Sequence, residues 1–570
     1  GGAQGLLLED QGSHPVDGCV EFLGHLGQGI DRAFHRSTSH SAPSGEMDLF
    51  KGLGQPNVAY SAGAAESESL GFSVGGAKDI NNYRDNIEND YLPVPTDLTY
   101  EGLFYDYYFD TGQSQACDKL FCPSYSYAIT KDPFSKEEEY YLSVGLNSNL
   151  GESDFERKKL NLVIVLDISG SMSSSFDRYY YDQFANEDAP EDDDWDKSKM
   201  QVANEAIVAL TKHLNGDDRF GMVLFDDQSY LAKPLNPVGE TDMEAIKGHI
   251  MDLAPQGGTN MEAGLSKGTE LFDAVLDADK EEYENRIIFL TDAMPNLGRT
   301  GEESLLGMTE SNSEDGIYLT FIGIGVDFNT ELTEAITKIK GANYYSVHSN
   351  TEFKERMDEG FEYMVTPMVF DLELNLEATG FDIEKVYGSP EANEATGQIM
   401  KVNTLFPSKT EGGQTKGGIV ILKLKKLSND TSLKLVASYE DRQGTKDSDE
   451  KTVAWEQKTP DYFANSGIRK GILLSRYANL MKNWMADEHA AYEENKQVET
   501  RMSETGIIIP PEYELGRWER QSVPLQVSSE YMLLFEDFSS YFRNEMNSIG
   551  DDTLQQELDI LIKLSDYNGQ

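Results

Sequence analysis

Between residues 158 and 365, short apolar runs alternate with amphipathic stretches of about ten residues or more. Such runs are typical of buried strands, and apolar residues spaced three and four apart are typical of helices, so the order predicts a parallel sheet with helices on its faces. Strands are expected at 160–167, 219–225, 286–291, 318–323 and 344–347, and helices at 199–214, 242–253, 260–276, 329–340 and 351–364. The central region is therefore predicted to be an α/β domain with a doubly wound, mostly parallel sheet.

The segments on either side of this region have the alternating pattern of antiparallel strands. The pattern marks SYSYAIT and YYLSVGLN before the region, and VFDLELNLE, GGIVILKLKKL and SLKLVASYE after it. The simplest account pairs the two sets of strands. The α/β domain, residues 158–365, would then be inserted in a discontinuous β-sandwich formed by residues 81–157 and 366–460.

The two ends of the chain have different patterns. Residues 1–80 are rich in Gly, Ser and Ala, which predicts a flexible arm or one that a partner orders. Residues 461–570 are predicted to be helical, with an apolar stripe at Leu473, Tyr477, Leu480, Met481 and Trp484. We expect these helices to pack on the sandwich, and binding of a separate partner is the alternative.

Composition limits the classes of partner. The 570 residues are too many for one core, and 48 basic against 100 acidic residues give a formal charge of −52. This charge argues against nucleic acid or anionic lipid as partners and favours cations, basic proteins or a salty environment. No apolar run reaches the roughly 18 to 20 residues that a membrane span needs. The chain begins GGAQGLLLED without an initiator Met, so we expect that any targeting peptide has been removed.

Cysteine is sparse, and two of the cysteines lie close together in ACDKLFCP. Cys117 and Cys122 either close a small disulfide loop or remain free thiols. Zinc is disfavoured because three cysteines without nearby histidines are too few for a zinc site.

Three segments carry oxygen-bearing side chains where predicted strands or loops end. LVIVLDISGS places Asp167, Ser169 and Ser171 at alternate positions after a strand, GGTN places Thr259 before a helix, and IIFLTD ends in Asp292. Because ligands bind at the carboxyl ends of parallel strands, we expect these side chains to face one cation. Carboxylates and hydroxyls are hard oxygen ligands that suit Mg²⁺, Mn²⁺ or Ca²⁺ rather than zinc.

In these three segments the chain resembles the von Willebrand factor A (VWA) domain family, over about residues 158–365. The resemblance implies a metal-ion-dependent adhesion site in which the first loop supplies Asp167, Ser169 and Ser171, the second Thr259 and the third Asp292. Ala293 stands where the family often has Gly, which fits if the backbone there avoids positive φ. Integrin β subunits, bacterial VWA lipoproteins and inter-alpha-trypsin inhibitor heavy chains are similar in placing β-rich segments beside such a domain.

The ligand chemistry predicts a function in binding. Mg²⁺ takes six oxygens at about 2.0 to 2.1 Å, so a site with fewer protein ligands keeps a position for water or for a partner's Asp or Glu. We therefore expect a divalent-cation-dependent protein–protein interaction or adhesion module in an extracellular, cell-surface or organelle-lumen protein. The alternative is a structural subunit of a large assembly that uses the domain as a scaffold. For the first loop alone, a polar turn that caps the next helix would suffice.

Enzyme classes are disfavoured by the motifs. The sequence has no H-E-x-x-H and no G-x-S-x-G, and GGTNMEAGLSKG lacks the spacing of a phosphate-binding loop. We therefore expect no enzymatic activity. A chelatase-type subunit would need its ATPase on another chain.

An acidic and aromatic insertion at 173–199 follows the first loop and is expected to overhang the metal face. Tyr179, Tyr180 and Tyr181 favour a contact surface, because exposed aromatic residues are costly unless covered. Its acidic residues either bind further Ca²⁺, attract a basic partner or are simply hydrated. They are Asp188, Glu191, Asp192, Asp193, Asp194 and Asp196.

Overall fold

A computed structural model of the chain describes residues 69–74, 80–113, 118–151, 155–175, 197–276, 281–292, 299–324, 335, 338–347, 350–389, 391–501 and 523–568. Most of the predicted N-terminal arm, the centre of the acidic insertion (176–196) and most of the predicted helix at 329–340 lie outside these residues. The chain divides into two compact units, of which the larger comprises Ser67–Thr130 and Glu139–Gln570. The described part of the smaller unit, Lys131–Glu138, contains a turn in which the Asp132 carboxylate accepts the backbone N–H groups of Phe134 and Ser135.

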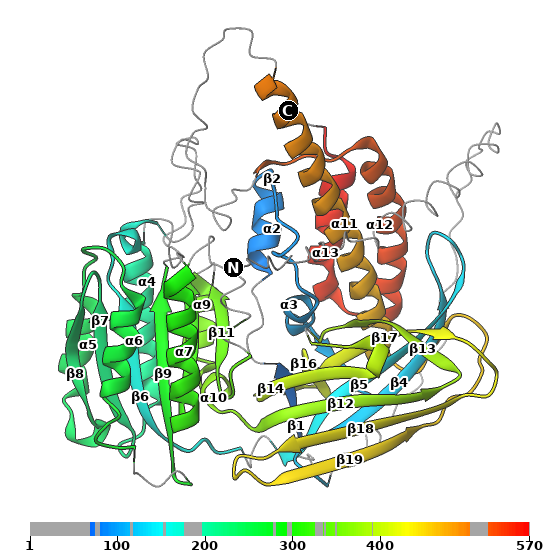
Figure 1. Ribbon diagram of the computed structural model, residues 1–570. Coiled ribbons are helices and arrows are strands. Elements are labelled where there is room, and N and C mark those ends of the chain that lie inside the picture. The colour runs from blue at the N-terminus through cyan, green and yellow to red at the C-terminus, as the bar shows by residue number, and fades with distance from the viewer. Residues whose placement is uncertain are drawn as a thin grey trace, which may run out of the picture. The chain divides into compact units, whose positions relative to one another are not determined.

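The central region of the larger unit contains a six-stranded sheet with the order β11-β10-β9-β6-β7-β8 (Figure 1). Its strands are β6 (Lys159–Asp167), β7 (Arg219–Phe225), β8 (Ser229–Pro237), β9 (Tyr283–Thr291), β10 (Ile317–Ile324) and β11 (Asn343–Val347). All neighbours pair in parallel except β8, which runs antiparallel at one edge. The predicted α/β class is confirmed. The sequence did not reveal β8, because its Pro234 and Pro237 argue against a strand and are tolerated only at an edge.

Helices cover both faces of this sheet (Figure 1). Leu162, Ile164 and Leu166 of β6 share a core with α4 (Lys199–Leu210), α5 (Met243–Met251), α9 (Asn350–Met357) and α10 (Phe361–Val365). Val163 and Val165 point to the other face, toward α6 (Met261–Glu270) and α7 (Arg299–Asp315). Burial on both faces explains why β6 is an almost continuous apolar run rather than an alternating one.

Strands from both sides of the α/β domain join in one ten-stranded antiparallel sheet, with the order β13-β17-β5-β1-β14-β12-β18-β19. Off this path, β4 pairs with β5, and β20 pairs with β4. The strands before the domain are β1 (Ser69–Val74), β4 (Cys122–Lys131) and β5 (Glu138–Gly151). Those after it are β12 (Val369–Thr379), β13 (Phe381–Tyr387), β14 (Gln398–Ser408), β17 (Ile419–Lys426), β18 (Ser432–Glu440), β19 (Lys446–Val453) and β20 (Tyr462–Phe463).

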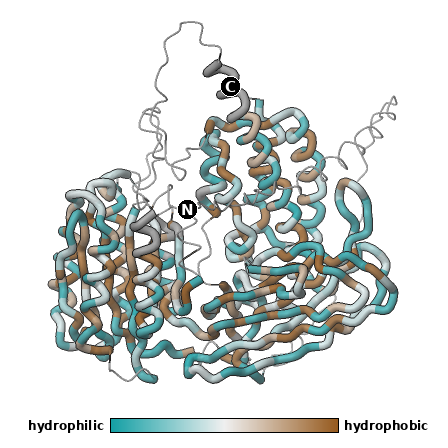
Figure 2. Tube along the Cα trace, viewed as in Figure 1, coloured by the Kyte–Doolittle hydropathy of each residue, from teal (hydrophilic) through white to brown (hydrophobic). Residues whose placement is uncertain are grey.

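Side chains from distant strands of this large sheet share one hydrophobic core. Val144 of β5 lies opposite Val420 of β17, so strands on the two sides of the domain are direct neighbours. At one end of the order, β19 is hydrophilic along nearly all of its length (Figure 2). Charged edge strands of this kind discourage pairing with another chain. Cys122, at the start of β4, is disulfide-bonded, and Cys117 lies outside the described residues.

Short elements accompany the large sheet, and the sequence did not predict most of them. Two helices lie between β1 and β4 in the chain, α2 (Asn81–Glu88) and α3 (Tyr100–Tyr105). Strands β15 (Thr410–Glu411), β16 (Gln414–Lys416) and β3 (Tyr108–Phe109) form a small sheet, and β2 (Tyr91–Leu92) pairs with β21 (Val523–Pro524).

The C-terminal region forms α11 (Ser466–Arg501), α12 (Ser529–Ile549) and α13 (Gln555–Ser565). The predicted apolar stripe is buried, and Trp484 packs edge-on against Phe535 of α12. A Cβ on Gly471 of α11 would lie 2.5 Å from the Ile421 side chain of β17, so glycine lets the helix approach the large sheet closely. The helices therefore pack on the chain's own core. None of the described helices is both long enough and apolar enough to cross a membrane.

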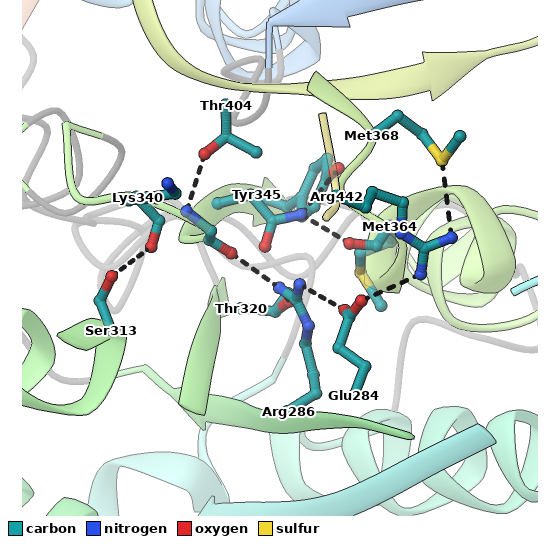
Figure 3. Close-up of polar contacts among 12 residues, drawn as sticks. Glu284, Arg286, Ser313, Thr320, Lys340, Tyr345, Met364, Met368, Thr404 and Arg442 are labelled. Carbon is teal, nitrogen blue, oxygen red and sulfur yellow. Dashed lines mark hydrogen bonds and ion pairs between the residues drawn. The ribbon is translucent and has the colours of Figure 1, made fainter. Parts of the chain in front are cut away.

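A buried network at the start of β9 contacts the large sheet (Figure 3). Arg286 is buried and donates to Glu284 Oε1 at 3.0 Å, to Thr320 Oγ1 at 3.1 Å and to the Gly341 carbonyl at 3.1 Å. Arg286 thereby joins β9 to β10 and to the turn before β11. A buried guanidinium needs such partners because its desolvation is expensive.

Two bonds extend this network to the large sheet. Arg442, in the turn after β18, reaches the second oxygen of Glu284 at 3.3 Å. The Gly341 N–H donates to Thr404 Oγ1 of β14 at 2.7 Å. Strand β9 is therefore fastened to the large sheet at the end opposite Asp292.

A second buried ion pair joins the two ends of the described chain. Arg84 of α2 donates through Nε to Glu557 Oε1 of α13 at 3.1 Å, and Tyr107 donates to the same oxygen at 2.9 Å. Glu557 is fully buried and Arg84 nearly so. Removal of one partner of such a pair leaves an uncompensated charge in the interior, which is strongly destabilising.

We expect Arg84→Met to lower the free energy of unfolding by about 3 kcal/mol, because Glu557 keeps its charge but loses the guanidinium. The control is Lys563→Met, which breaks the exposed pair with Asp90 and should change stability by less than about 1 kcal/mol. Denaturant unfolding measures both. The double variant Arg84→Met/Glu557→Leu should recover most of the loss, and equal instability of the single and double variants would contradict the explanation.

Candidate metal centre

Asp167 is the last residue of β6 and is fully buried. Its Oδ1 accepts the backbone N–H of Ser169 at 2.7 Å, and its Oδ2 accepts the hydroxyl of Thr291, at the end of β9, at 2.5 Å. The carboxylate is therefore held by its own loop and by the neighbouring strand. Both bonds fix its direction at the carboxyl edge of the sheet.

Three more predicted ligands meet at this edge. Ser169 Oγ and Ser171 Oγ are 2.9 Å apart, and the Ser171 hydroxyl donates to Asp292 Oδ1 at 2.7 Å. Neighbouring ligands of an octahedral ion with bonds of about 2.0 to 2.1 Å lie about 2.9 Å apart. The two serine hydroxyls therefore have the separation that adjacent ligands of Mg²⁺ require.

The second loop lies against the first through backbone hydrogen bonds. The Gly170 N–H donates to the Gly257 carbonyl at 3.1 Å, and the Gln256 N–H donates to the Ile168 carbonyl at 2.6 Å. Gly257 has φ +72°, and a Cβ there would lie 3.0 Å from the Asp226 side chain, so the close approach requires glycine. Thr259 is exposed in this loop, and among the described residues its hydroxyl makes no hydrogen bond to the other predicted ligands.

The structure thus brings four of the five predicted ligands together, and places the loop of the fifth beside them. Ser169 and the Asp292 side chain are buried, whereas Ser171 and Thr259 are exposed. The accessible side of the site is therefore the side of the two hydroxyls Ser171 and Thr259. Ala293 lies outside the described residues.

Sequence reasoning missed four residues at this edge. Asp226 follows β7 directly and accepts the Gln228 N–H at 2.9 Å, and Asp227 accepts the Gly258 N–H at 3.0 Å. Their position after a strand was a usable signal. Thr291 and Lys199 gave no such signal, because their roles depend on contacts with Asp167 and Asp292.

Lys199, the first residue of α4, pairs with Asp292, and its Nζ lies 3.2 Å from Oδ2. Asp292 therefore uses one oxygen for the Ser171 hydroxyl and the other for an ammonium group. This pair neutralises one of the two carboxylates among the predicted ligands.

Burial raises the pKa of Asp167 to about 6. The charge of Asp292 adds to this rise, and the hydrogen bonds from Thr291 and Ser169 oppose it. The cause is the cost of a carboxylate charge in a site shielded from water. A bound cation would favour the charged form.

The donor set fits a hard cation. The described residues contain no group of three or more His, Cys, Asp and Glu side chains arranged to hold a metal ion. The site instead combines two carboxylates with hydroxyls, which suits Mg²⁺, Mn²⁺ or Ca²⁺ better than zinc or copper.

The family model described as the von Willebrand factor type A domain matches residues 162–295. This stretch begins in β6, contains all three loops and ends just after Asp292. The resemblance inferred from the three loops is therefore confirmed, and this part of the chain is a VWA domain.

Curated relatives match a similar stretch of the chain. The inter-alpha-trypsin inhibitor heavy chain H1 of Mesocricetus auratus is 22% identical over 217 residues, which are 38% of this chain and 21% of the heavy chain. The chain thus spans about a fifth of the length of that relative. The uncharacterized protein YfbK of Escherichia coli is 24% identical over 255 residues, covering 44% of this chain and 39% of YfbK.

Among solved structures, a von Willebrand factor type A protein from Catenulispora acidiphila aligns with 65% of this chain and 82% of its own. The sequence identity is 16% and the TM-score is 0.37.

The raised pKa of Asp167 predicts a pH effect on the metal-free protein. The folded pKa, about 6, lies above the roughly 3.9 of an unfolded Asp, so the folded state binds this proton more tightly. Its contribution to the free energy of unfolding is therefore full below about pH 4 and falls by about 3 kcal/mol as the pH rises past 6.

Asp167→Asn removes this titration. In chelator, the stability of Asp167→Asn relative to wild type should rise by up to about 3 kcal/mol between pH 4 and pH 7. Denaturant unfolding at both pH values measures the difference. The control Asp430→Asn removes an exposed carboxylate and should show no comparable change. A pH-independent difference between Asp167→Asn and wild type would refute the effect.

Proposed function

We propose that the protein is a divalent-cation-dependent protein-binding or adhesion module. Mg²⁺, or Mn²⁺ or Ca²⁺, would be held by Asp167, Ser169, Ser171, Thr259 and Asp292. The observation that carries the proposal is the meeting of two serine hydroxyls and two aspartates at the carboxyl edge of the sheet. The ligand would be a carboxylate from an Asp or Glu of a partner protein.

The ligand chemistry supports recognition of an acid. Ser169 and Ser171 are neutral ligands, and the Asp167 oxygens already accept the Ser169 N–H and the Thr291 hydroxyl. A cation with few anionic ligands keeps much of its charge, and a carboxylate from outside can complete its shell. Ser171 and Thr259 form the exposed side, so an incoming carboxylate would enter there.

Several findings support a role in protein binding rather than in catalysis. VWA domains are known for protein–protein interaction, and they typically bind divalent metals. The charge of −52 disfavours nucleic acid and anionic lipid as partners. The disulfide of Cys122 supports an extracellular, cell-surface or organelle-lumen location, where disulfides persist. We propose that the protein acts by binding and has no enzymatic activity.

Loss of a ligand hydroxyl should weaken cation binding without unfolding the domain. Mutation of a residue that only hydrogen-bonds to a metal ligand typically lowers metal affinity by about 10- to 100-fold. Ser169→Ala and Ser171→Ala remove a ligand itself, so each should lower the affinity at least as much. Isothermal titration with Mg²⁺, Mn²⁺ and Ca²⁺ measures the loss. The matched control is Ser173→Ala, in the same loop, whose hydroxyl bonds to the Gly170 carbonyl. Equal affinity in Ser169→Ala, Ser171→Ala and the control would refute the site.

Partner binding should depend on the cation. An extract of the native source is passed over the immobilised wild-type protein, once in Mg²⁺ and once in chelator. A third sample is passed over immobilised Ser171→Ala in Mg²⁺. A specific partner should be retained only by the wild type in Mg²⁺, and free glutamate at high concentration should release it. Retention that is indifferent to chelator would instead favour the scaffold role in a large assembly.

A further inference from the structure

We propose that Lys199 tunes the cation site by neutralising Asp292, so that the site binds its cation less tightly but is one charge more positive once loaded. The inference rests on the proposed function and assigns to the site a residue that is not a ligand. It explains how one site can hold a cation and still attract an external acid.

The contact between Lys199 and Asp292 is well shielded. Lys199 Nζ lies 3.2 Å from Asp292 Oδ2, and the two side chains are 13% and 1% exposed. The other oxygen of Asp292 faces Ser171 Oγ at 2.7 Å. The ammonium therefore contacts one proposed ligand directly and is separated from Ser171 only by the Asp292 carboxylate, at a depth where solvent screens charge only partly.

Backbone contacts hold Lys199 at this place. Its N–H donates to the Ser174 carbonyl at 3.0 Å, and Ser175 forms an isolated antiparallel β-bridge with Ser198. Ser198 caps α4 in a reciprocal pair with Gln201. The start of α4 is thus fastened to the residues that follow the metal loop.

Helix α4 itself is not stabilised by a positively charged side chain at its first residue. The first turn of a helix carries a partial positive charge, so a lysine there is electrostatically unfavourable unless an acid compensates. Asp292 supplies that acid from another strand. The charge of Lys199 is therefore best explained by the metal edge and not by the stability of α4.

Charge arithmetic gives the consequence. Among the predicted ligands, Asp167 and Asp292 carry two negative charges, and the neighbouring Asp226 is also acidic. Lys199 makes the site one charge more positive than these carboxylates alone would leave it, with or without a divalent cation. Without Lys199 the loaded site would hold its cation more tightly and attract a carboxylate more weakly.

The first test is a Mg²⁺ titration of wild type, Lys199→Met and Lys197→Met by calorimetry. Lys197 pairs with Glu205 at 2.9 Å, so Lys197→Met removes the same charge from the same segment without touching Asp292. Lys199→Met should bind Mg²⁺ about tenfold more tightly than wild type, since a like charge close to the ion is removed. Lys197→Met should stay within about twofold.

The second test measures the pull on an external acid, with acetate as the probe. Acetate that coordinates bound Mn²⁺ has its carbon-13 carboxyl signal broadened. At equal Mn²⁺ loading, Lys199→Met should bind acetate more weakly than wild type, and Lys199→Arg, which keeps the charge, should behave more like wild type.

The outcomes separate the two claims. If wild type binds Mg²⁺ and Lys199→Met binds it equally or more weakly, the tuning role is overturned and the proposed function stands. If no variant binds a divalent cation, both fall. Thermal unfolding in chelator verifies that each variant is folded, and Lys199→Gln, which retains a polar side chain, replaces Lys199→Met if the latter is not.

Discussion

The parallel pairing of β6 with both β7 and β9 is the constraint on which the site depends. Asp167 lies opposite Phe225, and Leu166 lies opposite Leu290, so the three strands end at one edge. The residues that end or follow them, Asp167, Asp226 and Asp292, are all acidic. A carboxylate charge in a shielded place is unfavourable, and the raised pKa of Asp167 reflects its burial first and the charge of Asp292 second. Hydroxyl donors, Lys199 and the proposed cation each offset it.

Strand β9 connects this edge to the rest of the protein. Its first residues include Glu284 and Arg286, which bond to Arg442 beside the large sheet and to the turn before β11 (Figure 3). Its last residue, Thr291, orients Asp167 and precedes Asp292. One buried strand thus carries both the contact with the large sheet and the third metal loop. Its position is determined at both ends, so Asp292 is placed by more than its own loop.

The pattern of apolar and polar residues predicted those features that depend on the burial of a single strand. The apolar runs gave β6, β7 and β9, and the strand ends gave Asp167 and Asp292, because buried parallel strands and their ligand edge are visible in a continuous segment. Pairing in the large sheet was not fully predictable, since alternation of residues shows which face is buried and not which strand is the neighbour. Lys199 was missed because its contact joins α4 to the end of β9, far away in sequence.

A charge of −52 makes an acidic partner an unexpected choice for this protein. Salt screens exposed charges beyond about 8 to 10 Å, so the overall charge slows the approach of an acid but hardly acts on one already at the site. There the local balance decides, and a divalent ion together with Lys199 offsets the negative charge of the aspartates at the proposed site. Attraction of an acid would then depend entirely on the cation, and a protein that otherwise repels acids could bind one selectively.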